Sequence, residues 1–333
     1  MTSLPDDLRA AIDDVVAGRA PGSIGQASGR LSDAYRARRP SSSAVVAADD
    51  VSAYLLTRLP ATYAAIARVL AEVNARTDFA PRSLLDAGAG PGTASWAAAE
   101  QFEGVAEIVM LDENRRFLDV AGRLAAQSAT AALASATTVS GNLMSPRSAD
   151  RLFDLVLAGY ALTELGDAEI VPAAMALWQR CGGLLAIVEP GRPRDYARLM
   201  AVRAALLEAG AQMVAPCPHE AACPLPGGDW CHFSVRLPRS RAHRQAKGAS
   251  LGYEDEKFSY LAVARQGVAV RLPVARVIRP PVVRKFEVEL ALCAASGLDR
   301  AHILSREGGR FKAAKKLDWG DTFGGEEGTI GQN

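Results

Sequence analysis

The sequence predicts an α/β protein built around a doubly wound, mostly parallel sheet. From residue 83 onward, short apolar runs that end in glycine or polar residues alternate regularly with helical runs. The first of these runs leads through a glycine-rich turn straight into a helix, over residues 83–102. The run FDLVLA (153–158) is apolar almost throughout, as in parallel strands that are buried on both faces.

Each element of this region follows from its own pattern. Strands are expected where four to six apolar residues precede a turn, and helices where apolar residues recur at intervals of three and four. In such a sheet, ligands gather at the carboxyl ends of the strands. The expected strands are 83–86, 108–112, 138–140, 153–158 and 184–188, and the expected helices are 94–102, 115–127, 172–180 and 196–208.

The N-terminal part is expected to form a helical subdomain, residues 1–80. Apolar residues have helical spacing over residues 6–17 and again over 51–73. Pro40 and a Ser/Ala linker separate the two runs. We expect this subdomain to pack on a nucleotide-binding domain that covers residues 81–215.

The segment SLLDAGAGPGT (Ser83–Thr93) is the strongest motif. Gly88, Gly90 and Gly92 let the backbone adopt positive φ and approach a ligand, and the helix that follows presents free N–H groups. Dinucleotide-binding proteins use G-x-G-x-x-G, whereas this G-x-G-x-G with Asp86 before it is similar to motif I of class I S-adenosylmethionine (SAM) methyltransferases. SAM is therefore favoured over NAD. Asp112, at the end of the next strand, is predicted to accept both ribose hydroxyls.

Two further strand ends complete the predicted cofactor site. Asn142 is expected near the adenine, and Gly159 with Tyr160 near the methionine. Catalytic residues are not identified, because the run AGYALTEL replaces the N-P-P-Y type segment of amino-methylating enzymes. Glu164 and Glu189 are candidates for orienting or acid–base roles, or simple loop carboxylates.

Bulk composition is that of an ordinary globular protein, with 333 residues, 49% hydrophobic residues and a net charge of +1. The charge is polarised, however. Residues 236–316 contain 18 Lys and Arg against 7 Asp and Glu, so this segment carries +11 and the remainder −10. A basic half of this kind predicts a polyanionic partner. No run is apolar enough to span a membrane, and the N-terminus lacks a signal pattern, so a cytoplasmic monomer without membrane contact is expected.

Three cysteines fall within one irregular loop. Cys217, Cys223 and Cys231 are separated by five and seven residues and stand among prolines and glycines. In a reducing compartment such a group indicates a metal site. Zinc sites commonly show C-x₂₋₄-C pairs, which are missing here, and an iron–sulfur cluster needs four thiolates. Cys293 is the best fourth ligand, with Cys181, His219 and His232 in reserve, and zinc stays open as the alternative.

Taken together, these segments resemble one family. LLDAGAGPGT, IVEPG, CPH-x₃-CPL, WCHFSVRLPR, RPPVVRK and AAKKLDWGD are similar to the methyltransferase-like family of small-ribosomal-subunit assembly factors, over nearly the whole chain. The resemblance implies a class I methyltransferase fold, a 4Fe–4S cluster on Cys217, Cys223, Cys231 and Cys293, and association with small-subunit ribosomal RNA. It also implies that methyl transfer itself can be absent. The expected divisions are a cysteine-rich metal loop at 216–235, a basic β-rich RNA-binding extension at 236–322 and a disordered tail at 323–333.

Three functions follow from these features. The first is a SAM-dependent enzyme that methylates ribosomal RNA. The second is a catalytically inactive assembly or translation factor that binds ribosomal RNA and keeps the fold and the cluster. The third, a small-molecule methyltransferase with a structural zinc, fits the basic C-terminal half least well.

Overall fold

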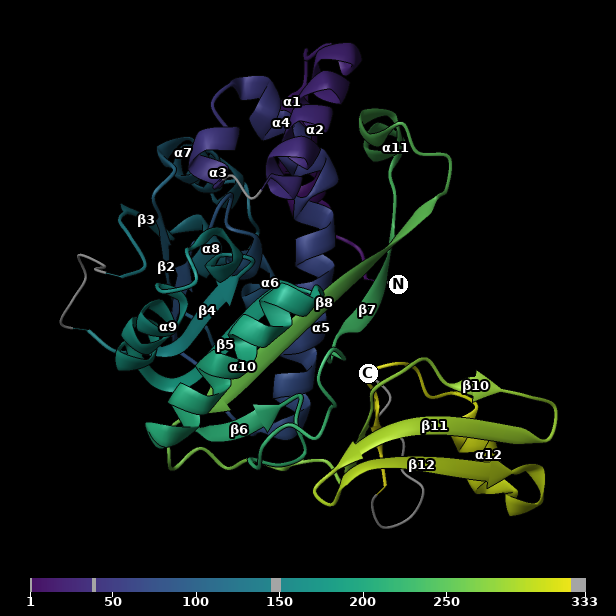
Figure 1. Cartoon of the computed structure of the whole chain (residues 1–333). Helices are drawn as coiled ribbons and strands as arrows, with labels where there is room; N and C mark the ends of the chain where they lie inside the picture. The colour runs from purple at the N-terminus through teal and green to yellow at the C-terminus, as the bar shows by residue number, and fades with distance from the viewer. Residues whose placement is uncertain (1, 38–39, 145–150, 325–333) are drawn as a thin grey trace.

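The computed structural model of the chain describes residues 2–37, 40–144 and 151–324, and its centre is an eight-stranded sheet (Figure 1). The strand order is β3-β2-β1-β4-β5-β8-β6, with β7 paired to the first half of β8. The first five strands are parallel, and β8 runs antiparallel between β5 and β6. The strands are β1 (Ser83–Ala87), β2 (Glu107–Asp112), β3 (Thr137–Ser140), β4 (Phe153–Gly159), β5 (Cys181–Pro190), β6 (Gln212–Ala215), β7 (Phe233–Pro238) and β8 (Tyr253–Ala264).

This order is that of the class I SAM-dependent methyltransferases, so the predicted fold class is confirmed. Neighbouring residues of a strand point to opposite faces, and Leu84 and Leu85 accordingly enter two separate cores. The helices on the two faces come from the alternating βα units. They are α6 (Thr93–Gln101), α7 (Arg115–Ala125), α8 (Ala131–Ala134), α9 (Ile170–Gln179) and α10 (Pro193–Glu208), with the 3₁₀ turn η1 (Leu162–Glu164) after β4.

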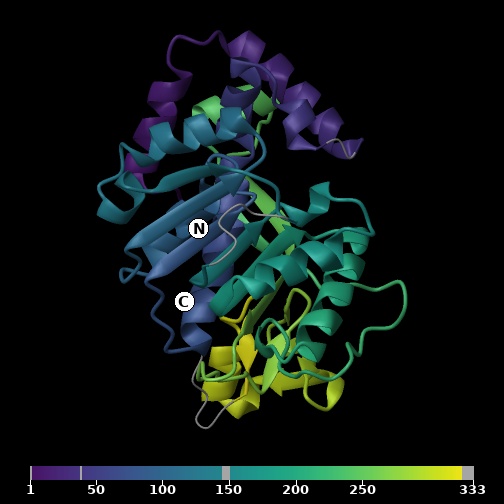
Figure 2. The same ribbon diagram turned by 90° about the vertical axis from the view of Figure 1, so that its left-hand side faces the viewer.

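The N-terminal helices cover one face and one end of the sheet (Figures 1 and 2). The helical pattern predicted over 51–73 is two helices rather than one, because Pro60 lacks an N–H and would clash inside a continuous helix. The helix over 21–36 is an addition to the prediction, since its three glycines weaken the helical signal. The helices are α1 (Asp6–Val16), α2 (Pro21–Arg36), α3 (Ser41–Ala44), α4 (Ala48–Thr57) and α5 (Leu59–Arg76).

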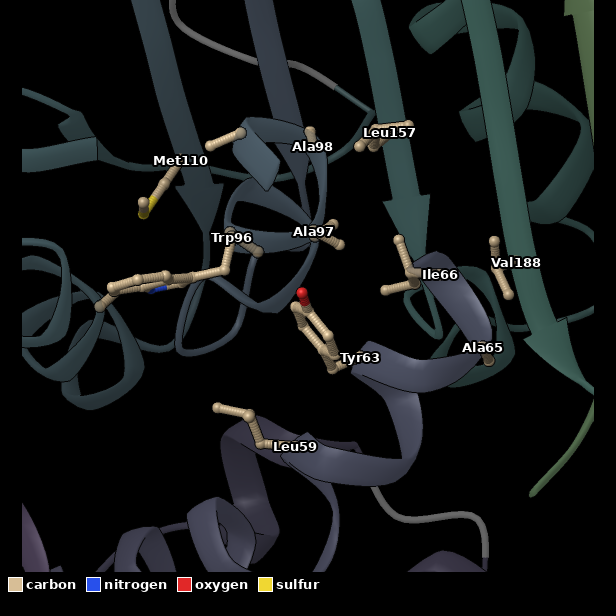
Figure 3. Close-up of a cluster of buried hydrophobic side chains, with 14 of the residues drawn as sticks. Leu59, Tyr63, Ala65, Ile66, Trp96, Ala97, Ala98, Met110, Leu157 and Val188 are labelled. Carbon is tan, nitrogen blue, oxygen red and sulfur yellow. The ribbon is translucent and has the colours of Figure 1, made fainter. Parts of the chain in front are cut away.

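Helix α5 is the main contact between this helical part and the sheet. Figure 3 shows Tyr63 and Ile66 of α5 packed toward Trp96 and Ala97 of α6, beside Leu157 of β4. All five side chains are almost fully buried, which anchors the glycine-rich turn at the start of α6 from both sides.

A second sheet of five strands lies beside the first, at the lower right of Figure 1, with its own apolar core. The predicted strand 258–265 is not part of it: β8 belongs to the main sheet, as does β7. The predicted boundary at 236 therefore does not separate the two sheets, and the tail beyond 324 lies outside the described residues. The remaining elements are α11 (Arg241–Lys247), β9 (Ala275–Val277), β10 (Val282–Val283), β11 (Glu287–Ala294), β12 (Gly297–Leu304), η2 (Ser305–Glu307), α12 (Gly309–Ala314) and β13 (Thr322–Phe323).

Arg276 of β9 joins the second sheet to the rest of the molecule. Its guanidinium is buried and donates to Glu72 Oε1 of α5 at 2.7 Å, to the Pro216 carbonyl at 2.9 Å and to the Gly320 carbonyl at 2.8 Å. One side chain thus connects a helix of the N-terminal part, the cysteine-rich loop and the C-terminal segment.

Candidate functional site

A cavity of about 360 Å³ lies at the carboxyl ends of β1, β2 and β4. Its volume is within the range of small-molecule binding sites, roughly 300–1,000 Å³. Six of the eight residues predicted to hold the cofactor line it, and they come from four different strand ends. They are Gly88, Gly90, Asp112, Asn142, Gly159 and Tyr160.

The glycine-rich turn is shaped by close packing as well as by backbone conformation. Gly88 has φ +72°, and a Cβ there would lie 2.4 Å from the Cβ of Ala161. Gly90 has φ +54°, and its N–H donates to Asp112 Oδ2 at 2.7 Å. Both conformations disfavour side chains other than glycine. The turn therefore forms a fixed wall of the cavity.

Asp86 and Gly92 do not line the cavity. Asp86 is 1% exposed, and its Oδ2 accepts hydrogen bonds from the Ser95 N–H at 2.9 Å and the Ser95 hydroxyl at 2.8 Å. Burial raises the pKa of Asp86 to about 7, against the opposing effect of the Ser95 hydrogen bonds. Gly92 has φ +85° at the start of α6, against Met110. In this structure, both residues support the turn from beneath rather than face a ligand.

Asp112 occupies the position predicted for a ribose-binding carboxylate. Its Oδ1 accepts from the Asn114 N–H at 2.7 Å, and burial raises its pKa. Its two oxygens thus accept backbone hydrogen bonds from both sides, from Gly90 in the glycine-rich turn and from Asn114 at the start of α7. Asn142 is exposed, and its side-chain oxygen accepts from the Met144 N–H at 2.6 Å.

The N-terminal part also contributes residues to the cavity wall, and the sequence analysis did not predict them. Ser41 of α3 donates from its N–H and its hydroxyl to Glu164 Oε2, at 2.9 and 3.0 Å. Burial raises the pKa of Glu164 to about 7. Tyr54 and Phe117 also line the cavity, with ring centroids 4.8 Å apart. No local motif marks these residues, because the chain brings them together only in the folded state.

Glu189, the other candidate carboxylate, lies outside the cavity wall. It is buried in β5, and its Oε1 accepts from the Leu162 N–H at 3.0 Å. Burial raises its pKa well above the usual range. Glu189 therefore orients η1 in this structure.

The four predicted thiol ligands line a second, mostly apolar pocket. The cavity between them is small, about 30 Å³. The pKa of the Cys231 thiol is raised, and burial is the largest cause. The neighbouring sulfurs of Cys217, Cys223 and Cys293 raise it further, which reflects their proximity. Among the described residues, no three His, Cys, Asp or Glu side chains lie close enough together to hold a single metal ion.

Other side chains of this pocket contact the thiols directly. The Tyr196 hydroxyl lies 3.0 Å from Cys223 Sγ, and His219 Nε2 lies 3.6 Å from Cys293 Sγ. Cys181, a reserve ligand, is buried in the core formed with α9 and does not line this pocket. His232 stacks on Trp230 at 5.0 Å and contacts Trp319 at 4.6 Å.

Arg203 of α10 borders this pocket and is 5% exposed. Its Nη2 donates to the carbonyls of His219 and Ala221, both at 2.9 Å, while its Nε has no hydrogen-bond partner. Arg203 forms no ion pair with a carboxylate in the described part of the chain, and its charge and its hydrogen bond to Cys217 lower the pKa of that thiol, opposing the larger effect of burial. A buried guanidinium without an anion is costly, so this pocket has positive charge that its own residues do not balance.

The basic excess of residues 236–316 is partly consumed by ion pairs. Arg236 pairs with Asp255, and Lys247 and Arg239 both pair with Glu254. The ring of Trp319 packs edge-on against His232. The exposed cations that form no ion pair within the described residues include Lys285, Arg306, Lys312, Lys315 and Lys316, all in the second sheet or around α12, where Phe286 is 62% exposed.

Comparison with known families follows from this geometry. The family model described as "Mitochondrial small ribosomal subunit Rsm22" matches residues 48–324. The chain belongs to the Rsm22 family. The match spans both sheets, most of the cavity wall and all four cysteines of the second pocket, so the resemblance noted in the sequence is confirmed.

Two curated relatives are similar to this Rsm22-family chain. The human protein "Ribosome assembly protein METTL17, mitochondrial" is 28% identical over 283 residues, covering 80% of this chain and 61% of the relative. The fission yeast "Rsm22-cox11 tandem protein 2, mitochondrial" (Schizosaccharomyces pombe) is 25% identical over 333 residues, covering 82% of this chain and 43% of the relative. The chain thus spans about half the length of these relatives.

Solved structures with similar folds are more distant. A putative RNA methyltransferase from Pyrococcus horikoshii is 14% identical with a TM-score of 0.40, covering 63% of this chain and 84% of its own. Magnesium protoporphyrin IX methyltransferase from Synechocystis with bound SAM is 14% identical with a TM-score of 0.41, covering 80% of this chain and 100% of its own. In the described residues, no helix has the length and apolarity to cross a membrane.

Proposed function

We propose that this Rsm22-family chain binds SAM in the cavity at the ends of β1, β2 and β4 and acts in small-subunit assembly, in contact with ribosomal RNA. One observation carries the cofactor assignment: Gly88, Gly90 and Asp112 converge on a cavity of suitable volume. Asp112 would accept the ribose hydroxyls, and Phe117 offers an apolar face to the adenine. The role in assembly is supported by the family and by the printed name of the human relative.

Calorimetric titration with SAM and S-adenosylhomocysteine tests the cofactor. We expect one site per chain, lost in Asp112→Ala and kept in Asp119→Ala, which alters an exposed carboxylate of α7. Absence of binding to both compounds, or binding of NAD in their place, contradicts the assignment.

We further propose that Cys217, Cys223, Cys231 and Cys293 hold a 4Fe–4S cluster. Four thiols are the ligand set of such clusters, and a metal–thiolate centre of either kind is anionic, which would balance Arg203. The four thiols line one pocket, and three of them lie on a loop that has neither helix nor strand. When bound, the cluster would connect this loop to β11.

Anaerobic metal and sulfide analysis distinguishes the cluster from zinc. We expect about four irons and four sulfides per chain, as a four-thiolate cluster requires. Stoichiometric zinc without iron in anaerobic preparations contradicts the cluster and supports the alternative.

The ribosomal RNA contact is assigned to the exposed lysines around α12. Lys312, Lys315 and Lys316 lie within five residues of one another, and none forms an ion pair in the described structure. The slope of log affinity against log salt is negative for such contacts. Replacing all three lysines with glutamine should make it less steep by about three. Arg123→Gln, an exposed change on α7, is the control and should leave the slope unchanged. An unaltered slope in the triple variant places the contact elsewhere.

Methyl transfer to ribosomal RNA is the second candidate, because Tyr160 lines both the cofactor cavity and a neighbouring pocket that could hold an acceptor group. Mass mapping of small-subunit RNA from a strain that lacks the chain separates the two. A missing methyl mark that wild type restores and Asp112→Ala does not supports the enzyme. Unchanged marks with a subunit-assembly defect support the non-catalytic factor.

A further inference from the structure

A smaller pocket, about 90 Å³, adjoins the cofactor cavity. The two share Tyr54, Tyr160 and Glu164 as wall residues. Tyr160 follows β4 and Pro190 ends β5, so the small pocket lies at the same edge of the sheet as the cavity. A group held in it would therefore face the space assigned to the cofactor.

Tyr160 stands at the junction of the two spaces in a strained conformation. Its φ is +59°, the one positive value at a non-glycine residue within the described ranges. Its N–H donates to the Val188 carbonyl at 2.6 Å, and its hydroxyl donates to Glu256 Oε1 at 2.9 Å. Such strain persists only where surrounding contacts hold it, and it concentrates at functional sites.

The volume of the pocket and its aromatic lining suit one ring of a larger ligand. Three tyrosines, Tyr35, Tyr54 and Tyr160, contribute to its wall. Its volume is well below the roughly 300 Å³ at which complete small-molecule sites begin. It therefore admits one planar group, while the remainder of the ligand stays outside.

The outer wall carries cations suited to an anionic ligand. Arg194 pairs with Asp195 at 2.7 Å, whereas Arg58 and Arg192 form no ion pair within the part of the chain described, although Arg58 is close enough to Glu256 of the same wall to lower the pKa of that carboxyl. The Arg58 guanidinium lies 4.8 Å from the centre of the Tyr35 ring. Guanidinium groups bind phosphate oxygens in two-point contacts, so Arg58 and Arg192 suit phosphates that flank a bound ring.

We propose that this pocket takes one unstacked base of single-stranded RNA, with its phosphates on Arg58 and Arg192. The inference rests on the proposed function and adds the acceptor side of the same site. A base must leave its stack to reach a closed pocket, and aromatic side chains stabilise it there. A polymer satisfies the geometry because only its base enters, while its backbone follows the arginines.

Photo-cross-linking tests this assignment on the full chain loaded with S-adenosylhomocysteine. The probe is a single-stranded RNA that contains 4-thiouridine, and cross-linked peptides are mapped by mass spectrometry. We expect cross-links on peptides that contain Tyr35, Tyr54 or Tyr160, reduced about tenfold in Arg58→Gln/Arg192→Gln, because the loss of the phosphate contacts lets the base leave. Arg123→Gln is the matched control and should cross-link like wild type.

The outcomes separate this inference from the proposed function. Cross-links confined to the second sheet, with RNA affinity intact, overturn the base pocket and leave the proposed function standing. Absence of RNA binding by the wild-type chain overturns both. The melting curve and S-adenosylhomocysteine binding show whether the double variant folds. If it does not fold, Arg192→Gln alone replaces it, since Arg192 is exposed.

Discussion

The cofactor cavity and the cysteine pocket differ in how far the chain itself satisfies their polar groups. In the cofactor cavity, Asp112 accepts hydrogen bonds from Gly90 and Asn114, and Glu164 accepts two from Ser41. In the cysteine pocket, by contrast, four thiols converge beside a guanidinium that lacks an anion, and His219 Nδ1 is buried without a hydrogen-bond partner.

This difference indicates two relations between ligand and fold. A site whose polar groups are already paired is preformed and loses little when it is empty. A site with an unbalanced buried charge depends on its ligand for stability, so that binding energy becomes folding energy. The predictions below test that contrast.

Loss of the metal should have the largest effect. Cys293→Ala removes the one proposed ligand outside the loop, so bound iron should fall to near zero and the melting temperature by roughly 10 °C. The matched control is Cys181→Ala, which removes a buried thiol of the main core. This variant protein should keep its bound iron. Iron content and thermal melting under anaerobic conditions measure both. Full iron in Cys293→Ala contradicts the ligand assignment.

Breaking the Arg276–Glu72 ion pair tests how much the stability of the region around the cysteine pocket depends on a buried charge pair. Glu72→Gln leaves Arg276 buried with carbonyl acceptors alone, and should lower the free energy of unfolding by about 3–5 kcal/mol. Glu100→Gln, at an exposed position of α6, should change it by less than about 0.5 kcal/mol. Urea denaturation of both variants gives the comparison. Equal midpoints would show that the pair does not hold the two sheets together.

The same contrast explains what the sequence allowed us to predict. Glycines and carboxylates at strand ends are set by local geometry. Gly88, Gly90 and Asp112, which the strand–turn–helix pattern and the resemblance to methyltransferase motif I indicated, line the cavity. The part of the cavity wall formed by Ser41 and Tyr54 depends on contacts over long sequence separations and has no local pattern. Cys293 was the preferred fourth ligand and the one that the family resemblance implied, and it lines the pocket with the other three thiols.

The predicted boundary at 236 differs from the division between the two sheets for a related physical reason. An alternating strand pattern does not say which sheet a strand joins, and β8 pairs with β5 rather than with the strands that follow it. Likewise, counting charges revealed the basic segment but not that Arg236, Arg239 and Lys247 are paired.

Gly88→Ala tests whether the cofactor cavity is truly preformed. The added Cβ would lie 2.4 Å from Ala161 in a left-handed backbone, so we expect about 2 kcal/mol of destabilisation and at least tenfold weaker S-adenosylhomocysteine binding. Gly29→Ala in α2, where the space is open, should instead stabilise the chain by about 0.5–1 kcal/mol. Calorimetry and urea denaturation report both quantities. Unchanged affinity in Gly88→Ala would mean that the turn adapts to its ligand.

The protonation of Asp86 makes the stability of the preformed glycine-rich turn depend on pH. Because burial raises its pKa from 3.8 to about 7, the folded chain holds a proton that the unfolded chain releases above pH 4. Its contribution to stability is therefore complete below about pH 4 and is lost as pH rises toward 7, by at most about 1.4 kcal/mol per pH unit. Asp86→Asn cannot titrate, so its unfolding free energy should fall less steeply than that of wild type between pH 5.5 and 7, by roughly 2 kcal/mol in total. Parallel pH profiles would show that Asp86 is ionised in the folded chain, and the support beneath the glycine turn would then contain an unbalanced charge, as the cysteine pocket does.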